Sequence, residues 1–169
     1  VGSEMCIRDS YRPEPEAASF IKPDPSFTPE ILKALISKVE ASVVVLPRSE
    51  QQRERLSKLP VSFLDRVTPV TPLVYADVMV GAAETMLQEA FVLAIPTVCC
   101  CYWTLSKPMR FLVNHVDYST RPSEVVRSVE SLLQARERER FKARARKVVQ
   151  SMDDPVEVFK RELEGMLKY

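Results

Sequence analysis

The sequence predicts an α/β fold: a three-layer domain with a mostly parallel sheet between helices, followed by further C-terminal helices. Short apolar runs such as 41–46 (ASVVVL) are typical of strands that are covered on both faces. Segments with apolar residues at helical spacing separate these runs, as in βαβ units. The chain has 169 residues, 46% of them hydrophobic, which is enough for the core of one such domain.

The first 27 residues show no secondary-structure period. Residues 1–10 do not begin with Met and resemble a translated sequencing-adapter scar, so we set them aside as a non-native leader and expect coding sequence upstream of Tyr11 to be missing. Residues 11–27 are rich in proline, which is typical of a linker entering a domain. Thr28 is predicted to cap the first helix, with Pro29 at its first position.

Strands and helices alternate through the predicted domain, residues 28–134. The expected strands lie at 41–46, 61–64, 78–80, 97–102 and near Tyr118. The expected helices lie at 28–39, 49–58, 85–94, 109–115 and 122–134. Residues 135–169 are predicted to form helices that pack on or near the domain, the last of them amphipathic.

Charge and hydropathy limit the partners. The formal net charge of +1 gives no field that would draw the whole molecule onto nucleic acid. Basic residues between 136 and 147 recur at every second position, so on a helix they spread around the cylinder; a patch for nucleic acid or phospholipid headgroups is the alternative. The longest apolar stretch, 90–103, is broken by Pro96 and is too short to cross a bilayer. We expect a soluble protein and leave peripheral membrane contact and the oligomeric state open.

The four cysteines are Cys6 and the consecutive Cys99, Cys100 and Cys101. This spacing contains no Cys-x-x-Cys metal motif and suggests no disulfide framework, which favours a reducing cytoplasm. We expect the three neighbouring thiols to be buried as small hydrophobes, with a redox role as the alternative. No metal site is predicted.

The segment 77–96, DVMVGAAETMLQEAFVLAIP, carries the strongest functional signal. A strand is predicted to end at Gly81 and a helix to begin near Thr85, so that the positive end of the helix dipole faces the carboxyl edge of the sheet. Open α/β sheets bind anions there, diphosphates above all. Glu89, one turn into the helix, could accept hydrogen bonds from both hydroxyls of a ribose. An ordinary structural βα unit has the same pattern and is the alternative.

Other polar residues follow the predicted strands at the same edge. Arg48 and Lys107 could each neutralise a diphosphate, with plain surface roles as the alternative. His115, the only histidine, is predicted to be structural. The sequence shows no Ser/His/Asp arrangement, paired-carboxylate motif or phosphate-binding loop signature, so no catalytic residue is assigned. Only one of its three glycines, Gly81, lies in the turn before the Thr85 helix, which argues against tight phosphate binding.

The order VVVLPRSEQQ followed by VYADVMVGAAETMLQEAFVLAIP resembles a known family. It is similar to the C-terminal half of the archaeal and bacterial glycosyltransferase-like family known as domain of unknown function 354, across roughly residues 12–126. That family resembles UDP-N-acetylglucosamine 2-epimerase and other GT-B-fold proteins. The resemblance implies a Rossmann-like domain that forms the C-terminal half of a GT-B-like fold.

The resemblance also implies a ligand site. Ala83, Glu84 and Thr85 would form the turn that receives the diphosphate of a UDP-type sugar, and Glu89 would bind its ribose. Gly81 and Ala82, at the end of the predicted strand, are counted with this nucleotide-binding turn. The family has glycine where this chain has Ala83, Glu84 and Ala94. A carboxylate at Glu84 would repel a diphosphate by roughly a few kcal/mol unless it turned into solvent or bound a metal ion.

The resemblance implies that this chain is the nucleotide-sugar-binding half of a glycosyltransferase-like or epimerase-like enzyme. This half would bind the nucleotide-sugar as a substrate, with no separate cofactor, while a missing N-terminal Rossmann-like domain would supply acceptor contacts and the acid or base. We expect the fragment alone to be inactive, and transfer versus epimerisation stays open. The alternative is a non-catalytic binding or assembly module that has lost nucleotide binding. A weaker third hypothesis is nucleic-acid association through the basic helix.

Overall fold

The computed structural model describes residues 8–14, 24, 26–64 and 73–166. They form an α/β domain around a six-stranded sheet in which every neighbouring pair is parallel. The strands are β1 (Arg8–Arg12), β2 (Ser42–Val45), β3 (Ser62–Phe63), β4 (Val78–Gly81), β5 (Thr97–Cys99) and β6 (Asp117–Tyr118). The helices are α1 (Phe27–Lys38), α2 (Glu50–Leu56), α4 (Glu84–Val92), α5 (Lys107–Leu112), α6 (Pro122–Leu133), α7 (Ala135–Gln150) and α8 (Pro155–Met166).

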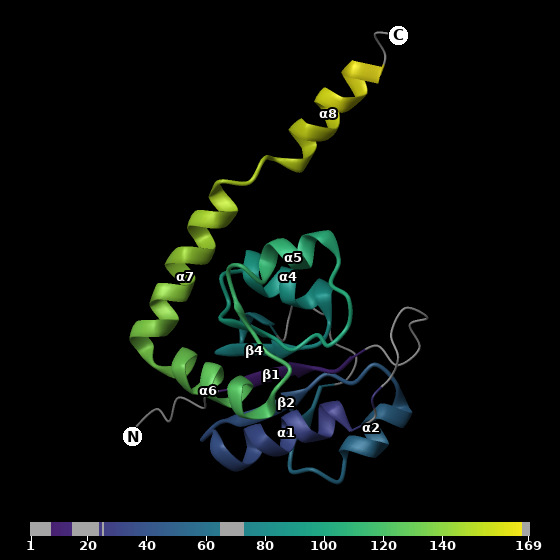
Figure 1. Cartoon of the computed structure of the whole chain (residues 1–169), viewed down its shortest axis with the longest axis vertical. Coiled ribbons are helices and arrows are strands. Elements are labelled where there is room, and N and C mark those ends of the chain that lie inside the picture. Colours follow the sequence, from purple (N-terminus) through teal and green to yellow (C-terminus); the bar gives the residue numbers. More distant parts are fainter. Residues whose placement is uncertain (1–7, 15–23, 25, 65–72, 167–169) are drawn as a thin grey trace.

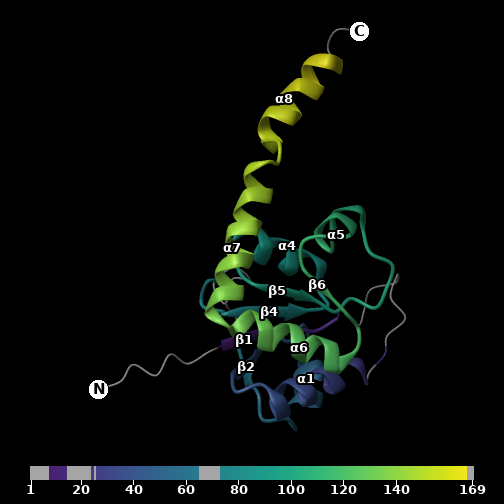
Figure 2. The ribbon, with the colours of Figure 1, turned by 60° about the vertical axis from the view of Figure 1, so that its left-hand side comes forward.

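The sheet has the strand order β3-β2-β1-β4-β5-β6. Helices α1 and α6 lie side by side on one face, and α4 and α5 cover the other (Figures 1 and 2). The direction in which strands are added reverses between β1 and β4, so the crevice beyond the carboxyl ends of these strands is the switch point where such sheets bind ligands. The predicted three-layer, parallel α/β fold is confirmed.

The central strand β1 is the main difference from the sequence-based expectation. Residues 1–10 were expected to lie outside the fold and residues 11–27 to form a linker, yet residues from both segments make β1, which pairs with β2 and β4. The strand RDSYR lacks the apolar run that marks a buried strand. Ser10 and Tyr11 are nevertheless buried, and the Tyr11 hydroxyl hydrogen-bonds with Thr28 Oγ1 at 3.0 Å. The rest of the expected leader and most of the linker lie outside the described residues.

Thr28 does not cap α1 as predicted. The helix begins at Phe27, two residues before the predicted first position at Pro29, and Ser26 occupies the cap position without a side-chain hydrogen bond. The Thr28 side chain is fully buried and donates a hydrogen bond to the Glu14 carboxylate. This threonine therefore ties α1 to the chain that leaves β1 at its carboxyl end.

The start of α2 follows the sequence pattern closely. Ser49 caps the helix as predicted, and its hydroxyl accepts a hydrogen bond from the Gln52 N–H at 3.1 Å. Strand β5 ends at Cys99, earlier than expected, and the chain then runs as a loop to α5. Cys99, Cys100 and Cys101 are free thiols with no exposed surface, in keeping with the predicted hydrophobic role. Cys6 lies outside the described residues.

The two C-terminal helices differ in how they pack. Helix α7 lies against α4 and α6, and the Phe141 ring meets Phe91 of α4 edge-on, with centroids 6.1 Å apart. Helix α8 projects away from the sheet (Figures 1 and 2), and none of its described residues is buried. Packing on the domain is therefore found for α7 and not for α8. None of the described helices is long and apolar enough to cross a membrane.

Candidate functional site

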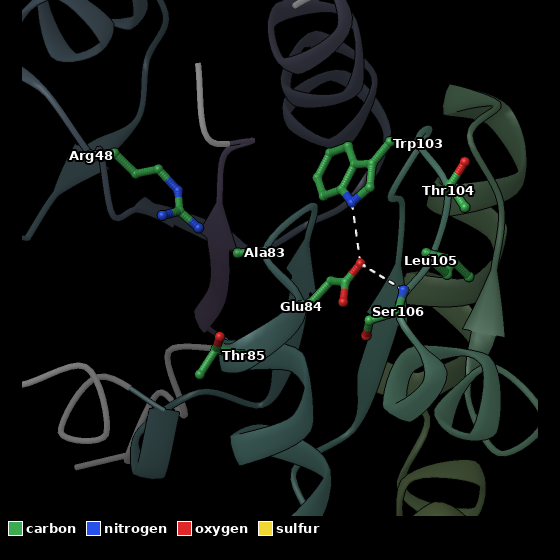
Figure 3. Close-up of a pocket in the computed structure, with 8 residues that line it drawn as sticks. All are labelled: Arg48, Ala83, Glu84, Thr85, Trp103, Thr104, Leu105 and Ser106. Atoms are coloured by element: carbon green, nitrogen blue, oxygen red, sulfur yellow. Dashed lines mark hydrogen bonds between the residues drawn. The ribbon is translucent and has the colours of Figure 1, made fainter. Parts of the chain in front are cut away.

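A cavity of about 560 Å³ opens at the carboxyl edge of the sheet, beside the switch point (Figure 3). Three segments line it: the loop after β2, the start of α4 and the loop after β5. The lining residues are Arg48, Ala83, Glu84, Thr85, Trp103, Thr104, Leu105 and Ser106. Half of the eight residues predicted for the site, namely Arg48, Ala83, Glu84 and Thr85, are thus brought together.

The start of α4 forms the floor of the cavity. Ala83 is the N-cap residue and has no side chain that could bond the first helical N–H groups, and the helix begins at Glu84 instead of the expected Thr85. The first N–H groups of a helix lack intrahelical acceptors, and the positive end of the dipole adds to their pull on an anion. The start of α4 is therefore able to receive an anionic group of a ligand.

Gly81 and Ala82 lie beside the cavity without lining it. The Ala82 N–H donates to the Arg12 carbonyl at 3.1 Å, and the Gly81 carbonyl accepts from the Cys100 N–H at 2.9 Å. These two residues therefore extend the sheet, and the Ala82 N–H is not free for a phosphate. A side chain at Gly81 would meet the Arg12 carbonyl oxygen at 3.3 Å, so the close approach of β1 and β4 favours glycine there.

Arg48 provides the cationic wall. Its backbone N–H donates to Gln52 Oε1 at 2.9 Å and its Nε donates to the Pro13 carbonyl at 3.2 Å. The side chain extends toward Ala83 (Figure 3), and among the described residues its two terminal nitrogens have no hydrogen-bond partner. Partial burial lowers the pKa of the Arg48 guanidinium, an effect that the nearby Glu14 carboxylate opposes. Arginine stays charged at neutral pH after such a shift.

A buried polar layer lies behind this wall. Arg12 Nη1 donates to the carbonyls of Leu46 and Pro47 at 2.8 and 3.2 Å. Burial and the neighbouring charge of Arg48 lower the pKa of Arg12. Glu14 is 1% exposed, and its backbone carbonyl accepts from Gln52 Nε2 at 3.2 Å. The guanidinium groups of Arg12 and Arg48 are near enough for their charges to interact at the ends of β1 and β2.

The opposite wall is acidic and aromatic. Glu84 Oε1 accepts hydrogen bonds from Trp103 Nε1 at 3.2 Å and from the Ser106 N–H at 3.3 Å (Figure 3). The Glu84 carboxylate therefore turns toward the loop after β5 and not toward Arg48. The carboxylate still lines the cavity, so its negative charge still opposes an anion at the helix start, from the side of the loop after β5.

Glu89 and Lys107 do not line the cavity. Glu89 lies four residues beyond Thr85, so the two residues share one face of α4. Its Oε2 atom is buried and has no hydrogen-bond partner among the described residues. Lys107 is the exposed first residue of α5. The expectation that Glu89 and Lys107 face the same cavity as Thr85 is not met, although Glu89 is within one helical turn of it.

His115 has the structural surroundings expected of it. Its ring lies against those of Phe111 and Phe91, with centroid distances of 4.8 and 6.0 Å. Across the described ranges, no group of three His, Cys, Asp or Glu side chains is arranged to hold a metal ion. Among the residues that line the cavity, Glu84 is the one carboxylate, and histidine is not among them.

Sequence reasoning missed Arg12, Glu14 and the loop residues 103–106. Arg12 and Glu14 flank a proline directly after a strand, a signal that becomes visible only once β1 is recognised. Residues 103–106 follow a buried strand in a loop without periodicity. Trp103, as the only tryptophan at the edge of a parallel sheet, was the available signal there.

Solved structures with a similar fold include glycosyltransferases and UDP-GlcNAc 2-epimerases. The spinosyn rhamnosyltransferase SpnG matches 95% of this chain over 45% of its own, with 15% identity and a TM-score of 0.71. It has also been solved in complex with thymidine diphosphate. The UDP-GlcNAc 2-epimerase of Neisseria meningitidis, bound to UDP-GlcNAc, matches 96% of this chain over 44% of its own, with 14% identity and a TM-score of 0.59. The fold is therefore Rossmann-like and of the GT-B type.

A sequence relative and a family model complete the comparison. An uncharacterized protein of Methanocaldococcus jannaschii, MJ0665, is 32% identical over 90 residues, which cover 53% of this chain and 26% of that protein. The chain spans less than half the length of MJ0665 and of the two enzymes above. The model of a family described as "Protein of unknown function (DUF354)" matches residues 5–167, a stretch that includes part of the segment set aside as a leader. The chain belongs to this family.

Proposed function

We propose that this chain is the donor-binding half of a GT-B-like protein and that its cavity binds the diphosphate of a UDP-type sugar. The single observation that carries the proposal is that the Arg48 guanidinium and the start of α4 face one cavity at the switch point of the sheet. The ligands named for the structural relatives, thymidine diphosphate and UDP-GlcNAc, support a nucleoside diphosphate as the ligand class.

The diphosphate would lie between two positive groups. Arg48 has both terminal nitrogens free among the described residues, and a guanidinium binds phosphate oxygens with two parallel hydrogen bonds. The N–H groups of Glu84 and Thr85 would contact the other phosphate oxygens. The same groups would stabilise the charge that develops on the diphosphate when it leaves the sugar.

The ribose would lie one helical turn further along α4. Glu89 shares the helix face of Thr85, and its buried Oε2 lacks a donor among the described residues. Two adjacent ribose hydroxyls would supply the missing donors once the Glu89 side chain turned from its buried position toward the cavity. Phosphates at the helix start and ribose at Glu89 match the order of these groups along a nucleotide.

The remaining steps of a reaction would need a second domain. The lining of the cavity contains no histidine, and its one carboxylate, Glu84, is engaged with Trp103 and Ser106. We infer that an N-terminal domain supplies the acceptor contacts and the acid or base, and that this half alone has no turnover. No cofactor besides the nucleotide-sugar is required. The free, buried Cys99, Cys100 and Cys101 favour a cytoplasmic location.

A second candidate is a non-catalytic binding or assembly module. Two observations favour it: a carboxylate at the first position of α4, and the Ala82 N–H occupied by the Arg12 carbonyl. Both reduce the pull of the turn on a diphosphate. The two candidates differ in whether the cavity binds UDP.

Titration calorimetry of the full chain with UDP separates the candidates. We expect wild type to bind UDP and Arg48→Ala to bind it about tenfold to a hundredfold more weakly, the effect of losing a charge-assisted contact. Arg127→Ala, at an exposed position of α6, is the matched control and should bind like wild type. Absence of UDP binding by wild type, or equal binding by Arg48→Ala, would favour the second candidate.

The role of Glu89 is tested by comparing UDP with inorganic diphosphate, because both ligands carry a diphosphate group. Glu89→Gln should weaken binding of UDP and leave binding of inorganic diphosphate unchanged, because only UDP carries a ribose. An equal loss for both ligands would show that Glu89 acts on the helix start and not on the sugar of the nucleoside.

A further inference from the structure

The two walls of the cavity carry opposite charge. Arg48 supplies a cation on one side, whereas the Glu84 carboxylate and the Trp103 indole form the other (Figure 3). A nucleotide-sugar has a matching polarity, with an anionic diphosphate next to an uncharged ring rich in hydroxyls. Building on the proposed function, we propose that Glu84 and Trp103 form the sugar subsite and that this subsite selects a neutral sugar over a sugar acid.

The Glu84 carboxylate acts only as a hydrogen-bond acceptor. Its Oε1 accepts from Trp103 Nε1 and the Ser106 N–H, while Oε2 has no partner among the described residues. An ionised carboxylate has no proton to donate, so the group that meets Oε2 must supply one. Sugar hydroxyls do this, and the phosphate or carboxylate oxygens of a ligand do not.

The carboxylate is fixed in place by the elements around it. Glu84 is the first residue of α4, where a negative charge is favoured by the helix dipole. Its two hydrogen bonds tie α4 to the loop after β5, because Ser106 is the N-cap residue of α5. The negative charge is therefore a fixed part of this wall, and a ligand has to match it.

Trp103 contributes an apolar surface next to that charge. Its ring stands nearly perpendicular to the Tyr102 ring, with an interplanar angle of 78° and centroids 5.3 Å apart, so its orientation is set by packing. Its only polar hydrogen is already donated to Glu84. Leu105 lines the same wall. An aromatic face beside a hydrogen-bond acceptor suits a sugar ring, which presents C–H groups on one face and hydroxyls at its edge.

The test compares UDP, UDP-glucose and UDP-glucuronate by calorimetry on the full chain. The two sugars differ only at C6, a hydroxymethyl group in one and a carboxylate in the other. A second carboxylate near Glu84 is repelled, so UDP-glucuronate should bind about tenfold more weakly than UDP-glucose. Glu84→Gln should remove most of that difference and leave UDP itself bound as in wild type or more tightly.

Trp103→Leu is the second variant. Removal of the aromatic face should bring the affinity for UDP-glucose close to that for UDP, while UDP binding persists. Circular dichroism checks that both variants are folded. Equal binding of the two sugars by wild type, or an unchanged difference in Glu84→Gln, would overturn the sugar subsite and leave the proposed function standing. No binding of UDP by wild type would overturn both.

Discussion

The two walls of the cavity are built in opposite ways. The basic wall carries Arg48, whose side chain is itself exposed, and it is backed by the half-buried Arg12 and the buried Glu14 and Gln52, which are held by hydrogen bonds. The acidic wall rests on half-exposed side chains of a loop and one carboxylate, Glu84. The groups behind Arg48 are part of the folded interior, so changes in them should lower stability. The acidic wall can be changed with little loss of stability, so its substitutions should alter ligand choice.

The largest stability effect is expected at Glu14. Glu14→Ala removes the buried acceptor of the Thr28 hydroxyl and the negative charge near Arg48, which should lower the free energy of unfolding by about 3 kcal/mol. Urea denaturation measures it. The control is Glu130→Ala, an exposed position of α6 where a change within about 0.5 kcal/mol is expected. If the two variants were equally stable, the basic wall would not be part of the core.

A smaller loss is expected when Arg12 is replaced. Arg12→Met keeps most of the apolar stem and removes the hydrogen bonds to the carbonyls of Leu46 and Pro47, which should cost about 2 kcal/mol of unfolding free energy. The same substitution at Arg127, exposed on α6, serves as the control in urea denaturation. A loss at Arg12 no greater than at Arg127 would contradict the tethering role.

Alkaline pH should lower the stability of the protein through Tyr11, whose hydroxyl bonds the same Thr28 side chain that donates to Glu14. Burial raises the pKa of this phenol well above its usual value of 10.0, so the folded protein keeps Tyr11 neutral while the unfolded chain ionises it. Its contribution to stability is complete below pH 10 and falls by about 1.4 kcal/mol per pH unit above it. Urea midpoints at pH 9 and 11 should therefore fall further for wild type than for Tyr11→Phe. Parallel losses would show that Tyr11 is not buried as a neutral group.

The smallest stability effect is expected on the acidic wall. Glu84→Gln keeps an acceptor for Trp103 Nε1 and the Ser106 N–H, so the unfolding free energy should change by less than about 1 kcal/mol. The matched comparison is Glu14→Gln, which should cost more because Glu14 is buried. A severe loss in Glu84→Gln would mean that both walls belong to the core.

The sequence predicted the part of the fold where pattern and packing agree. The alternation of apolar strands with capped helices can be seen within short stretches of sequence. The elements from Ser42 to Leu133 and the parallel sheet could therefore be predicted from it. The turn before α4 was found because a strand followed by small residues and a helix is itself a local pattern. Ala83, Glu84 and Thr85 belong to this pattern, and all three line the cavity.

The missed features depend on distant partners. Strand β1 is polar in sequence, and its burial becomes favourable only because Thr28 and neighbouring strands satisfy its groups. The loop 103–106 has no period, and its role follows from its contact with Glu84. The amphipathic pattern of α8 was recognised correctly. The spacing of apolar residues shows that a helix has an apolar face but not which element covers it, and in the structure this face of α8 is exposed.

The most direct test of nucleotide binding at the start of α4 is a titration of the ¹⁵N-labelled chain with UDP, followed by amide NMR spectra. The backbone signals of Ala83, Glu84 and Thr85 and the indole N–H of Trp103 should shift together, and those of α6 should stay in place. In Arg48→Ala the same shifts should need about tenfold to a hundredfold more UDP. Shifts that cluster elsewhere, or none at UDP concentrations in the millimolar range, would contradict a diphosphate site in this cavity.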